Sequence, residues 1–245
     1  MTRRKSFAIT RSSLDDMDPP ATKASVLRTY EEIAEDVEER RQTPWTDVID
    51  FEKTLPRGRT VLELGCGSGR NAVHFALAGH RVIAIDFARG MLGRAATRAK
   101  ENSVAGSVNL IQADVTAPPI KDSSVDVCLY VAALHHLPTR QERIRSLEQL
   151  RRCLKPGGKA FVSVWAFEQR RFQRILERHK LKKEGFGDVL IAIKSKEGQA
   201  IRRFYHLFVE GELEQLIAEA GLEIGQHFKS HDNYFVVAVN LHGTR

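Results

Sequence analysis

Apolar residues follow two different spacings along most of the chain. Between residues 24 and 41 they recur every three or four positions, which predicts an amphipathic helix, and Pro44-Trp45 opens a second, shorter one. From residue 60 onward, short apolar runs typical of buried strands alternate with helical stretches. This alternation predicts an α/β protein with a doubly wound, mostly parallel sheet. We expect strands at 60–64, 81–86, 108–113, 125–131 and 159–166, and helices at 70–79, 88–102 and 139–154.

The last third of the chain has a different order of elements. A helix with one apolar face is expected at 210–220, followed by strands at 222–228 and 234–239. Only Ser230-His231-Asp232-Asn233 joins these two strands, and so short a link predicts that they pair antiparallel. The predicted fold is therefore a seven-stranded, mostly parallel sheet with a C-terminal antiparallel hairpin.

The polar and apolar segments divide the chain into three predicted parts. Residues 1–20 are polar, end in Pro19-Pro20 and are expected to form a mobile tail. Residues 21–57 form an N-terminal helical leader, and 58–240 form the main domain. We expect a basic insertion in that domain, at about 168–203.

The net charge of +7 is concentrated in this insertion. Residues 168–203 hold eleven Lys and Arg against five Asp and Glu, so the segment alone carries +6. Clustered positive charge indicates a polyanionic partner. A solvated insertion kept soluble by its lysines explains the same charge, and on charge alone the two interpretations remain equal.

The cysteines indicate a reducing compartment. Cys66, Cys128 and Cys153 are odd in number and widely spaced, which predicts neither a disulfide framework nor a zinc site. His135-His136 has no second cluster of ligands at metal spacing, so no metal site is predicted. No apolar run approaches a membrane span and no secretory signal is recognised, so a cytoplasmic protein is expected.

A glycine-rich loop lies between the first predicted strand and the following helix. It reads Glu63-Leu64-Gly65-Cys66-Gly67-Ser68-Gly69. Dinucleotide sites favour G-x-G-x-x-G, because a pyrophosphate must sit on the helix N-terminus. A cofactor that has no phosphate but carries an ammonium and a sulfonium suits this carboxylate-flanked loop better. Asp86 ends the second predicted strand, where it can take ribose hydroxyls. Asp114 follows the third, where it can accept from an adenine amino group or cap the turn before Thr116.

Together these motifs resemble the class I S-adenosylmethionine-dependent methyltransferases, over about residues 58–240. The segment 132–137 resembles the stretch after strand four of that class, and Leu154-Lys155-Pro156-Gly157-Gly158 resembles its turn before strand five. The resemblance implies a Rossmann-like sheet and S-adenosylmethionine as the cofactor. The cofactor-binding residues that it implies are Glu63, Gly65, Cys66, Gly67, Gly69, Arg70, Asp86, Phe87, Asp114, Val115, Ala132 and Ala133.

Other motifs resemble one family in particular, the tRNA wobble-uridine carboxymethyl methyltransferases. They are Tyr30-x-x-Ile33-Ala34, Arg41-x-x-Pro44-Trp45, the segment 164–169, the segment 203–213 beginning Arg203-Phe204-Tyr205-His206, and Asp232-Asn233-Tyr234. Most members place Arg where this chain has His231. The resemblance implies that the enzyme methylates the carboxylate of a 5-carboxymethyl-type uridine in the anticodon of tRNA. It also implies a small zinc-binding activator protein as a partner.

A carboxylate acceptor simplifies the chemistry that the site must provide. Because the carboxylate is ionised at neutral pH, it needs alignment and a partly dry site but no general base. Cations that could hold it or nearby phosphates include Arg70. The candidate catalytic residues are His135, His136, Arg41, Arg203 and His231.

Several of these assignments have equally ordinary alternatives. Arg41 serves as readily in a salt bridge at a helix end, and Trp45 is more often a core or rim aromatic than a platform for a base. A methyltransferase of the same class acting on a small carboxylic acid or a quinone precursor explains the shared motifs as well. A catalytically silent scaffold that binds tRNA or a protein is a third alternative.

Overall fold

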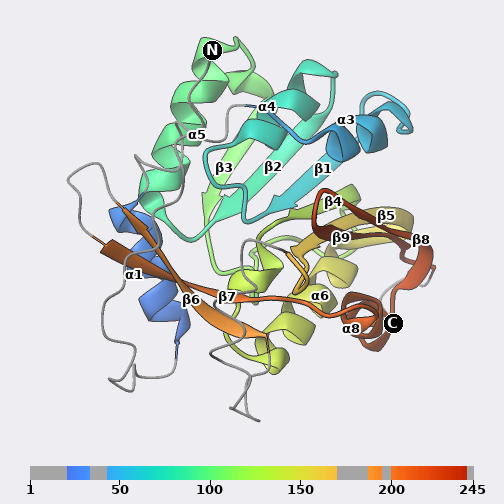
Figure 1. Cartoon of the computed structure of the whole chain (residues 1–245). Helices are drawn as coiled ribbons and strands as arrows, with labels where there is room; N and C mark the ends of the chain where they lie inside the picture. Colours follow the sequence, from blue (N-terminus) through green and yellow to red (C-terminus); the bar gives the residue numbers. More distant parts are fainter. Residues whose placement is uncertain (1–20, 34–42, 170–186, 195–199, 242–245) are drawn as a thin grey trace, which may run out of the picture.

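A seven-stranded sheet forms the centre of the protein (Figure 1). The computed structural model describes residues 21–33, 43–169, 187–194 and 200–241. The strands lie in the order β3-β2-β1-β4-β5-β9-β8, with the first five parallel and β9 antiparallel to both of its neighbours. Their bounds are β1 (Thr60–Leu64), β2 (Arg81–Asp86), β3 (Val108–Gln112), β4 (Val125–Val131), β5 (Leu154–Trp165), β8 (Glu223–Ser230) and β9 (Asn233–Val239). This is the Rossmann-like fold expected from the sequence.

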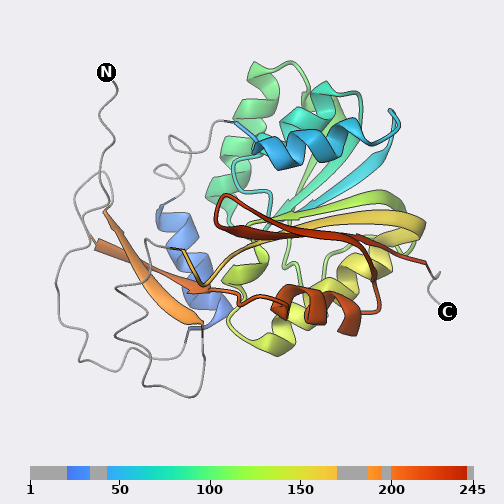
Figure 2. The same cartoon turned by 45° about the vertical axis from the view of Figure 1, so that its right-hand side comes forward.

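Helices cover both faces of the sheet (Figure 2). Successive residues of a strand point to opposite faces, so Val61 packs with the helices of one layer and Leu62 with those of the other. Two cores result, one on each side of the sheet. The first layer contains α3 (Thr46–Lys53), α4 (Arg70–Leu77) and α5 (Arg89–Glu101), and the second contains α6 (Arg140–Cys153) and α8 (Glu212–Glu219).

The C-terminal hairpin pairs as the sequence predicts. Its link is a two-residue turn in which His231 and Asp232 both have positive φ, at 46° and 63°. Such a turn matches the right-handed twist of the paired strands. Phe235 of β9 packs on Phe161 of β5 and stacks on Phe228 of β8, which joins the hairpin to the first core.

Two details differ from the predicted elements. Strand β5 begins at Leu154, five residues earlier than expected, because Leu154 already pairs with Val125. Lys159 pairs with Val127, so the four residues 155–158 loop out opposite a single residue of β4. The N-terminal helix α1 (Lys23–Glu32) ends sooner than predicted, and the rest of its predicted range lies outside the described residues, as does the predicted tail.

A separate antiparallel pair, β6 (Asp188–Lys194) and β7 (Ala200–His206), was not predicted. It occupies part of the expected basic insertion and lies beside α1, away from the main sheet (Figures 1 and 2). Most of the basic residues of that insertion fall in 170–186 and 195–199, outside the described part of the chain. None of the described helices is long and apolar enough to cross a membrane.

His206 anchors this pair to the main domain. Its Nδ1 lies 2.7 Å from Oδ1 of Asp188 on β6, and its Nε2 lies 2.7 Å from Oε1 of Glu212 on α8. Burial alone would lower the pKa of His206, but these two hydrogen bonds outweigh it and raise the pKa above 6.5. A protonated His206 donates one N–H to Asp188 and the other to Glu212, so its imidazolium joins β7 to β6 and to α8.

We predict that a His206→Gln substitution destabilises the protein most at mildly acidic pH. A raised pKa means that the stabilising contribution is complete below about 6.5 and is lost as the pH rises through the folded-state value. The expected loss in free energy of unfolding is about 2–4 kcal/mol at pH 6, and it shrinks toward pH 9. Urea unfolding of both proteins at each pH measures it. A His227→Gln control, with an imidazole that is 67% exposed, should change little, and a His206 effect that does not vary with pH would contradict the prediction.

Candidate cofactor and acceptor site

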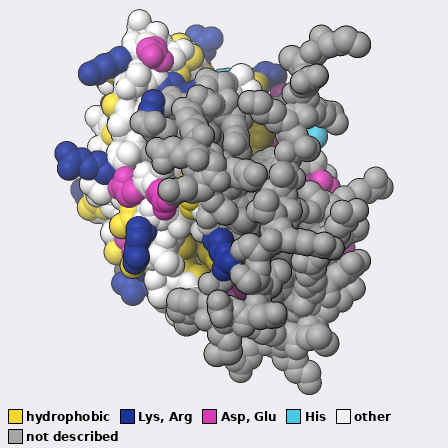
Figure 3. Space-filling model, turned by 60° about the vertical axis from the view of Figure 1, so that its left-hand side comes forward, with side chains coloured by type: hydrophobic (Ala, Val, Ile, Leu, Met, Phe, Trp, Pro, Cys, Tyr) yellow, Lys and Arg dark blue, Asp and Glu magenta, His cyan; other side chains and the backbone are white. Residues whose placement is uncertain are grey.

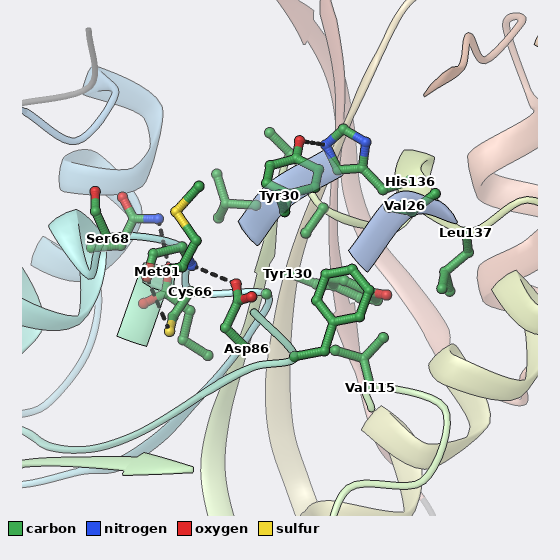
Figure 4. Close-up of a pocket in the computed structure, with 18 of the residues that line it drawn as sticks. Val26, Tyr30, Cys66, Ser68, Asp86, Met91, Val115, Tyr130, His136 and Leu137 are labelled. Atoms are coloured by element: carbon green, nitrogen blue, oxygen red, sulfur yellow. Dashed lines mark hydrogen bonds between the residues drawn. The ribbon is translucent and has the colours of Figure 1, made fainter. Parts of the chain in front are cut away.

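One cavity lies at the carboxyl ends of β1, β2, β3 and β4, beneath α1. The glycine-rich loop forms part of its wall, and Tyr30 and His136 face it from the opposite side (Figure 4). The structure brings eleven of the twelve predicted cofactor residues to this cavity. They are Glu63, Gly65, Cys66, Gly67, Arg70, Asp86, Phe87, Asp114, Val115, Ala132 and Ala133.

Two glycines of the loop are required by close packing. Gly65 has φ +68°, and a Cβ there would lie 2.5 Å from Cβ of Ala133, so β1 and the segment after β4 can meet only at glycine. Gly69, the twelfth predicted residue, does not line the cavity. It has φ +76°, and a Cβ would lie 2.8 Å from Cβ of Ala95, so Gly69 lets α4 begin against α5.

Glu63 presents an unpaired oxygen to the cavity. Its Oε1 accepts a 2.8 Å hydrogen bond from Nδ2 of Asn71, whereas Oε2, and Oδ1 of Asn71, have no hydrogen-bond partner among the described residues. Burial raises the pKa of Glu63 to about 7. Two buried acceptors without donors are costly unless a ligand supplies the donor. They fit the ammonium group of S-adenosylmethionine, and Asn71 is a residue that the sequence analysis missed.

Asp86 joins the loop to the start of α5. Its Oδ2 accepts from N–H of Gly67 at 2.8 Å and its Oδ1 from N–H of Ala88 at 3.0 Å (Figure 4 shows Asp86 beside Cys66 and Met91). Burial raises the pKa of Asp86 to about 6. A carboxylate accepts more than two hydrogen bonds, so Asp86 retains lone pairs for hydroxyl groups of a ligand.

Asp114 caps a turn and also lines the cavity. Its Oδ1 accepts from N–H and Oγ1 of Thr116, both at 2.8 Å, and its Oδ2 lies 2.5 Å from Nζ of Lys23 on α1. Burial would raise the pKa of Asp114, but the hydrogen bonds from Lys23 and Thr116 lower it below 3.8. The position of Asp114 is therefore compatible with both alternatives from the sequence, the contact to an adenine amino group and the turn cap. The sequence did not indicate Lys23 as a partner of Asp114.

The two adjacent histidines have different surroundings. His136 lines the cavity, with Nδ1 3.1 Å from the carbonyl oxygen of Phe204 and Nε2 2.6 Å from Oη of Tyr30. Because a carbonyl can only accept, Nδ1 carries the proton, and in the neutral ring Nε2 accepts from Tyr30. His135 is fully buried, does not line the cavity, and accepts from N–H of Trp165 through Nδ1.

The remaining candidates for holding the acceptor are Arg203, Arg70, His231 and Arg41. Arg203, on β7, is buried, its Nε has no hydrogen-bond partner among the described residues, and its guanidinium lies 5.2 Å from the ring centre of Tyr205. Arg70 lies 5.0 Å from the ring centre of Trp45, a half-buried indole that also packs edge-on against Phe235. His231 is at the hairpin turn, 82% exposed and away from the cavity. Arg41 lies outside the described residues.

Known proteins with similar sequences are methyltransferases. The family model for the methyltransferase domain matches residues 62–162. A protein of Encephalitozoon cuniculi that is provisionally named a methyltransferase is 31% identical over 90% of this chain and 99% of its own length. The chain belongs to the S-adenosylmethionine-dependent methyltransferases.

Several relatives have names that specify a substrate. The tRNA (carboxymethyluridine(34)-5-O)-methyltransferase of Schizosaccharomyces pombe is 28% identical over 87% of this methyltransferase and 95% of the relative. The enzyme ALKBH8 of Macaca fascicularis, with the same activity in its name, is 34% identical over 59% of the chain. The match spans only 20% of the length of ALKBH8.

Solved structures share the fold. A methyltransferase dependent on S-adenosylmethionine from Methanosarcina mazei aligns with a TM-score of 0.68 at 21% identity, covering 81% of this chain and 99% of its own. A Burkholderia thailandensis methyltransferase with bound S-adenosylhomocysteine aligns at 0.67 and 19% identity, covering 93% and 97%. A Haloferax volcanii methyltransferase in complex with the Trm112 activator aligns at 0.63 and 19%, covering 87% and 98%.

We predict that Glu63→Gln weakens S-adenosylmethionine binding about tenfold to 150-fold at pH 8, since a hydrogen bond to a charged group contributes about 1.5–3 kcal/mol. For the native protein, affinity should increase as the pH rises from 6 to 8, because ionised Glu63, with its pKa of about 7, binds the ammonium. Calorimetric titration across this range tests both statements. The Glu63→Gln variant should lose the pH dependence of affinity near pH 7, whereas the control Glu101→Gln, at an exposed position, should keep it. If Glu63→Gln binds with native affinity at pH 8, Glu63 does not belong to the cofactor site.

Proposed function

We propose that this methyltransferase esterifies the carboxylate of a 5-carboxymethyl-type wobble uridine in tRNA. The observation that carries the proposal is the buried Arg203, whose Nε has no hydrogen-bond partner and which forms no ion pair among the described residues. An unpaired cation in a protein interior is costly, so an incoming anion is its natural partner. The planar guanidinium suits two-point binding of a carboxylate or a phosphate.

The position of Arg203 on β7 supports an acceptor role. Alternate residues of a strand share a face, so Arg203 lies between Ile201 and Tyr205 on the same side. Ile201 packs with Met91, which lines the cofactor cavity, and the ring of Tyr205 lies 4.6 Å from that of His136, which also lines it. Arg203 therefore faces the region next to the cavity, where an acceptor would approach the methyl group.

The chemistry of the described site favours an acceptor that is already ionised. S-adenosylmethionine supplies a methyl group on a positively charged sulfur, which an ionised oxygen can attack directly. His136 lines the cavity, and both of its ring nitrogens are engaged, by the carbonyl oxygen of Phe204 and by Oη of Tyr30. The residues then have only to hold the acceptor in line and exclude water.

Two further observations support a tRNA substrate. The S. pombe relative, matched over nearly its whole length, has carboxymethyluridine-34 of tRNA in its name. The basic excess of 168–203 suits a polyanion. In the described part of the face drawn in Figure 3, Lys and Arg side chains are scattered, with Asp and Glu between them.

We also propose a small activator protein as a partner, because the Haloferax structure pairs a protein of this fold with such an activator.

The three cysteines are free and buried, which suits a cytoplasmic location.

We predict that Arg203→Gln lowers methyl transfer to tRNA by about a hundredfold, the cost of losing a buried charged contact of about 3 kcal/mol. The affinity for S-adenosylmethionine should stay within about twofold, because Arg203 does not line the cofactor cavity. Transfer of labelled methyl to bulk tRNA, followed by nucleoside mass analysis, measures activity, and calorimetry measures cofactor binding. Arg202→Gln is the control, since Arg202 is the exposed neighbour on the opposite side of β7.

The product distinguishes this proposal from its alternatives. Label in a base-hydrolysable ester of a uridine supports carboxylate methylation. Label that appears only in a small-molecule extract would make the protein a small-molecule methyltransferase instead. Arg203→Gln with native transfer to tRNA would remove Arg203 from the acceptor site.

A further inference from the structure

Helix α5 lacks a capping side chain of its own. The residue at its N-cap position is Ala88, which has the extended backbone of a cap but no side-chain acceptor. The first amides of a helix need acceptors, which Ser, Thr, Asp or Asn usually provide at this position. Here Glu31 provides them from α1: its Oε1 accepts from N–H of Arg89 at 2.6 Å and its Oε2 from N–H of Gly90 at 2.9 Å.

The helix that carries Glu31 covers the cofactor cavity. Lys23, Val26 and Tyr30 of α1 all line that cavity, and Figure 4 shows Val26 and Tyr30 facing it. Lys23 at one end of the helix pairs with Asp114, and Glu31 at the other end binds the start of α5. At 1.5 Å per residue these two contacts are about 12 Å apart along the helix, so they fix α1 near both of its ends.

We propose that Glu31 is a latch: its contact with the N-terminus of α5 holds α1 closed over the cofactor, and breaking this contact is a step in cofactor exchange. The inference concerns cofactor binding and does not depend on the identity of the acceptor. Glu31 is a positioning residue, because it does not line the cavity itself.

Three features suit Glu31 to this role. Its side chain is exposed, so water can replace the carboxylate when α1 lifts and the latch remains reversible. A carboxylate on the amides of a helix N-terminus is a charge-assisted contact, which is stronger than a neutral one. The latched turn also belongs to the cofactor site, since Oδ1 of Asp86 accepts from N–H of Ala88, directly before α5.

In this position α1 also contacts His136 and β7, the strand that carries Arg203. Oη of Tyr30 bonds to His136, and Oγ1 of Thr29 lies 3.4 Å from the carbonyl oxygen of Arg202 on β7. The helix therefore touches the cofactor cavity, the start of α5 and the strand that carries Arg203. Opening the latch loosens the wall that separates the cofactor from solvent on this side.

The absence of a cap at Ala88 allows a test that separates a latch from a simple helix cap. Glu31→Ala removes both functions, whereas the double variant Glu31→Ala/Ala88→Ser gives α5 a cap of its own without restoring the contact to α1. Glu32→Ala is the matched control, because Glu32 is the exposed neighbour on the same helix and has no hydrogen bond or ion pair with the described residues. Full-length protein is loaded with tritiated S-adenosylmethionine and chased with unlabelled S-adenosylhomocysteine, and the release rate is followed together with the melting temperature.

We expect Glu31→Ala to release label about fivefold to tenfold faster than the native protein and to melt at a lower temperature. The double variant should regain the melting temperature but keep the fast release, and Glu32→Ala should behave like the native protein. Slow release in the double variant would reduce Glu31 to a cap and overturn the proposal. Native release by Glu31→Ala would overturn it as well. Glu31→Gln, which keeps the shape but not the charge, should release at an intermediate rate even if Glu31→Ala folds poorly.

Discussion

The cavity depends first on the close contact between the end of β1 and the segment that follows β4. At Gly65 a single added carbon would lie 2.5 Å from Cβ of Ala133, so the two segments can approach this closely only when one of them lacks a side chain. This approach brings the glycine loop and the end of β4 to one cavity. Ala132, beside it, has φ +52°, a conformation that a non-glycine residue adopts only when its surroundings impose it. The cavity therefore depends on backbone geometry before any side chain contributes.

Polar groups around this cavity fall into two classes. Asp86 and Asp114 are satisfied by the protein, through the loop, the α5 turn, Thr116 and Lys23, so their positions are set without a ligand. Glu63 and Arg203 instead retain buried atoms without partners among the described residues. One is an acceptor and the other a cation, and they lie on different elements, β1 and β7. The ligands of the proposed function would satisfy both: the ammonium of the cofactor would pair with Glu63, and the anionic acceptor with Arg203.

The sequence predicted the main sheet and most of the cavity because both depend on local patterns. Strand and helix periodicity, the loop from Glu63 to Gly69, and acids at strand ends are each visible within a few residues. The role of Gly69 was not visible, because it depends on Ala95 in another helix. Lys23 and Tyr30 were missed as cavity residues because they reach the cavity only when α1 folds across it. Asn71 was missed although it lies only two residues after the loop. The β6–β7 pair was not predicted, because its residues lie in a basic segment that was expected to form an insertion and was assigned no strands.

The placement of β7 explains how a decoration outside the main sheet can define the acceptor. Its backbone is tied to the cavity through His136, whose Nδ1 donates to the carbonyl of Phe204, and its last residue, His206, is clamped to Glu212 of the main domain. Between these two anchors and Ile201, the side chain of Arg203 has little freedom to reach solvent. A cation held rigidly in a buried position selects an anion by location as well as by charge, whereas a flexible surface lysine would bind any anion weakly. Under the proposed function, the main sheet and its loops hold the cofactor, and the added pair β6–β7 selects the acceptor through Arg203.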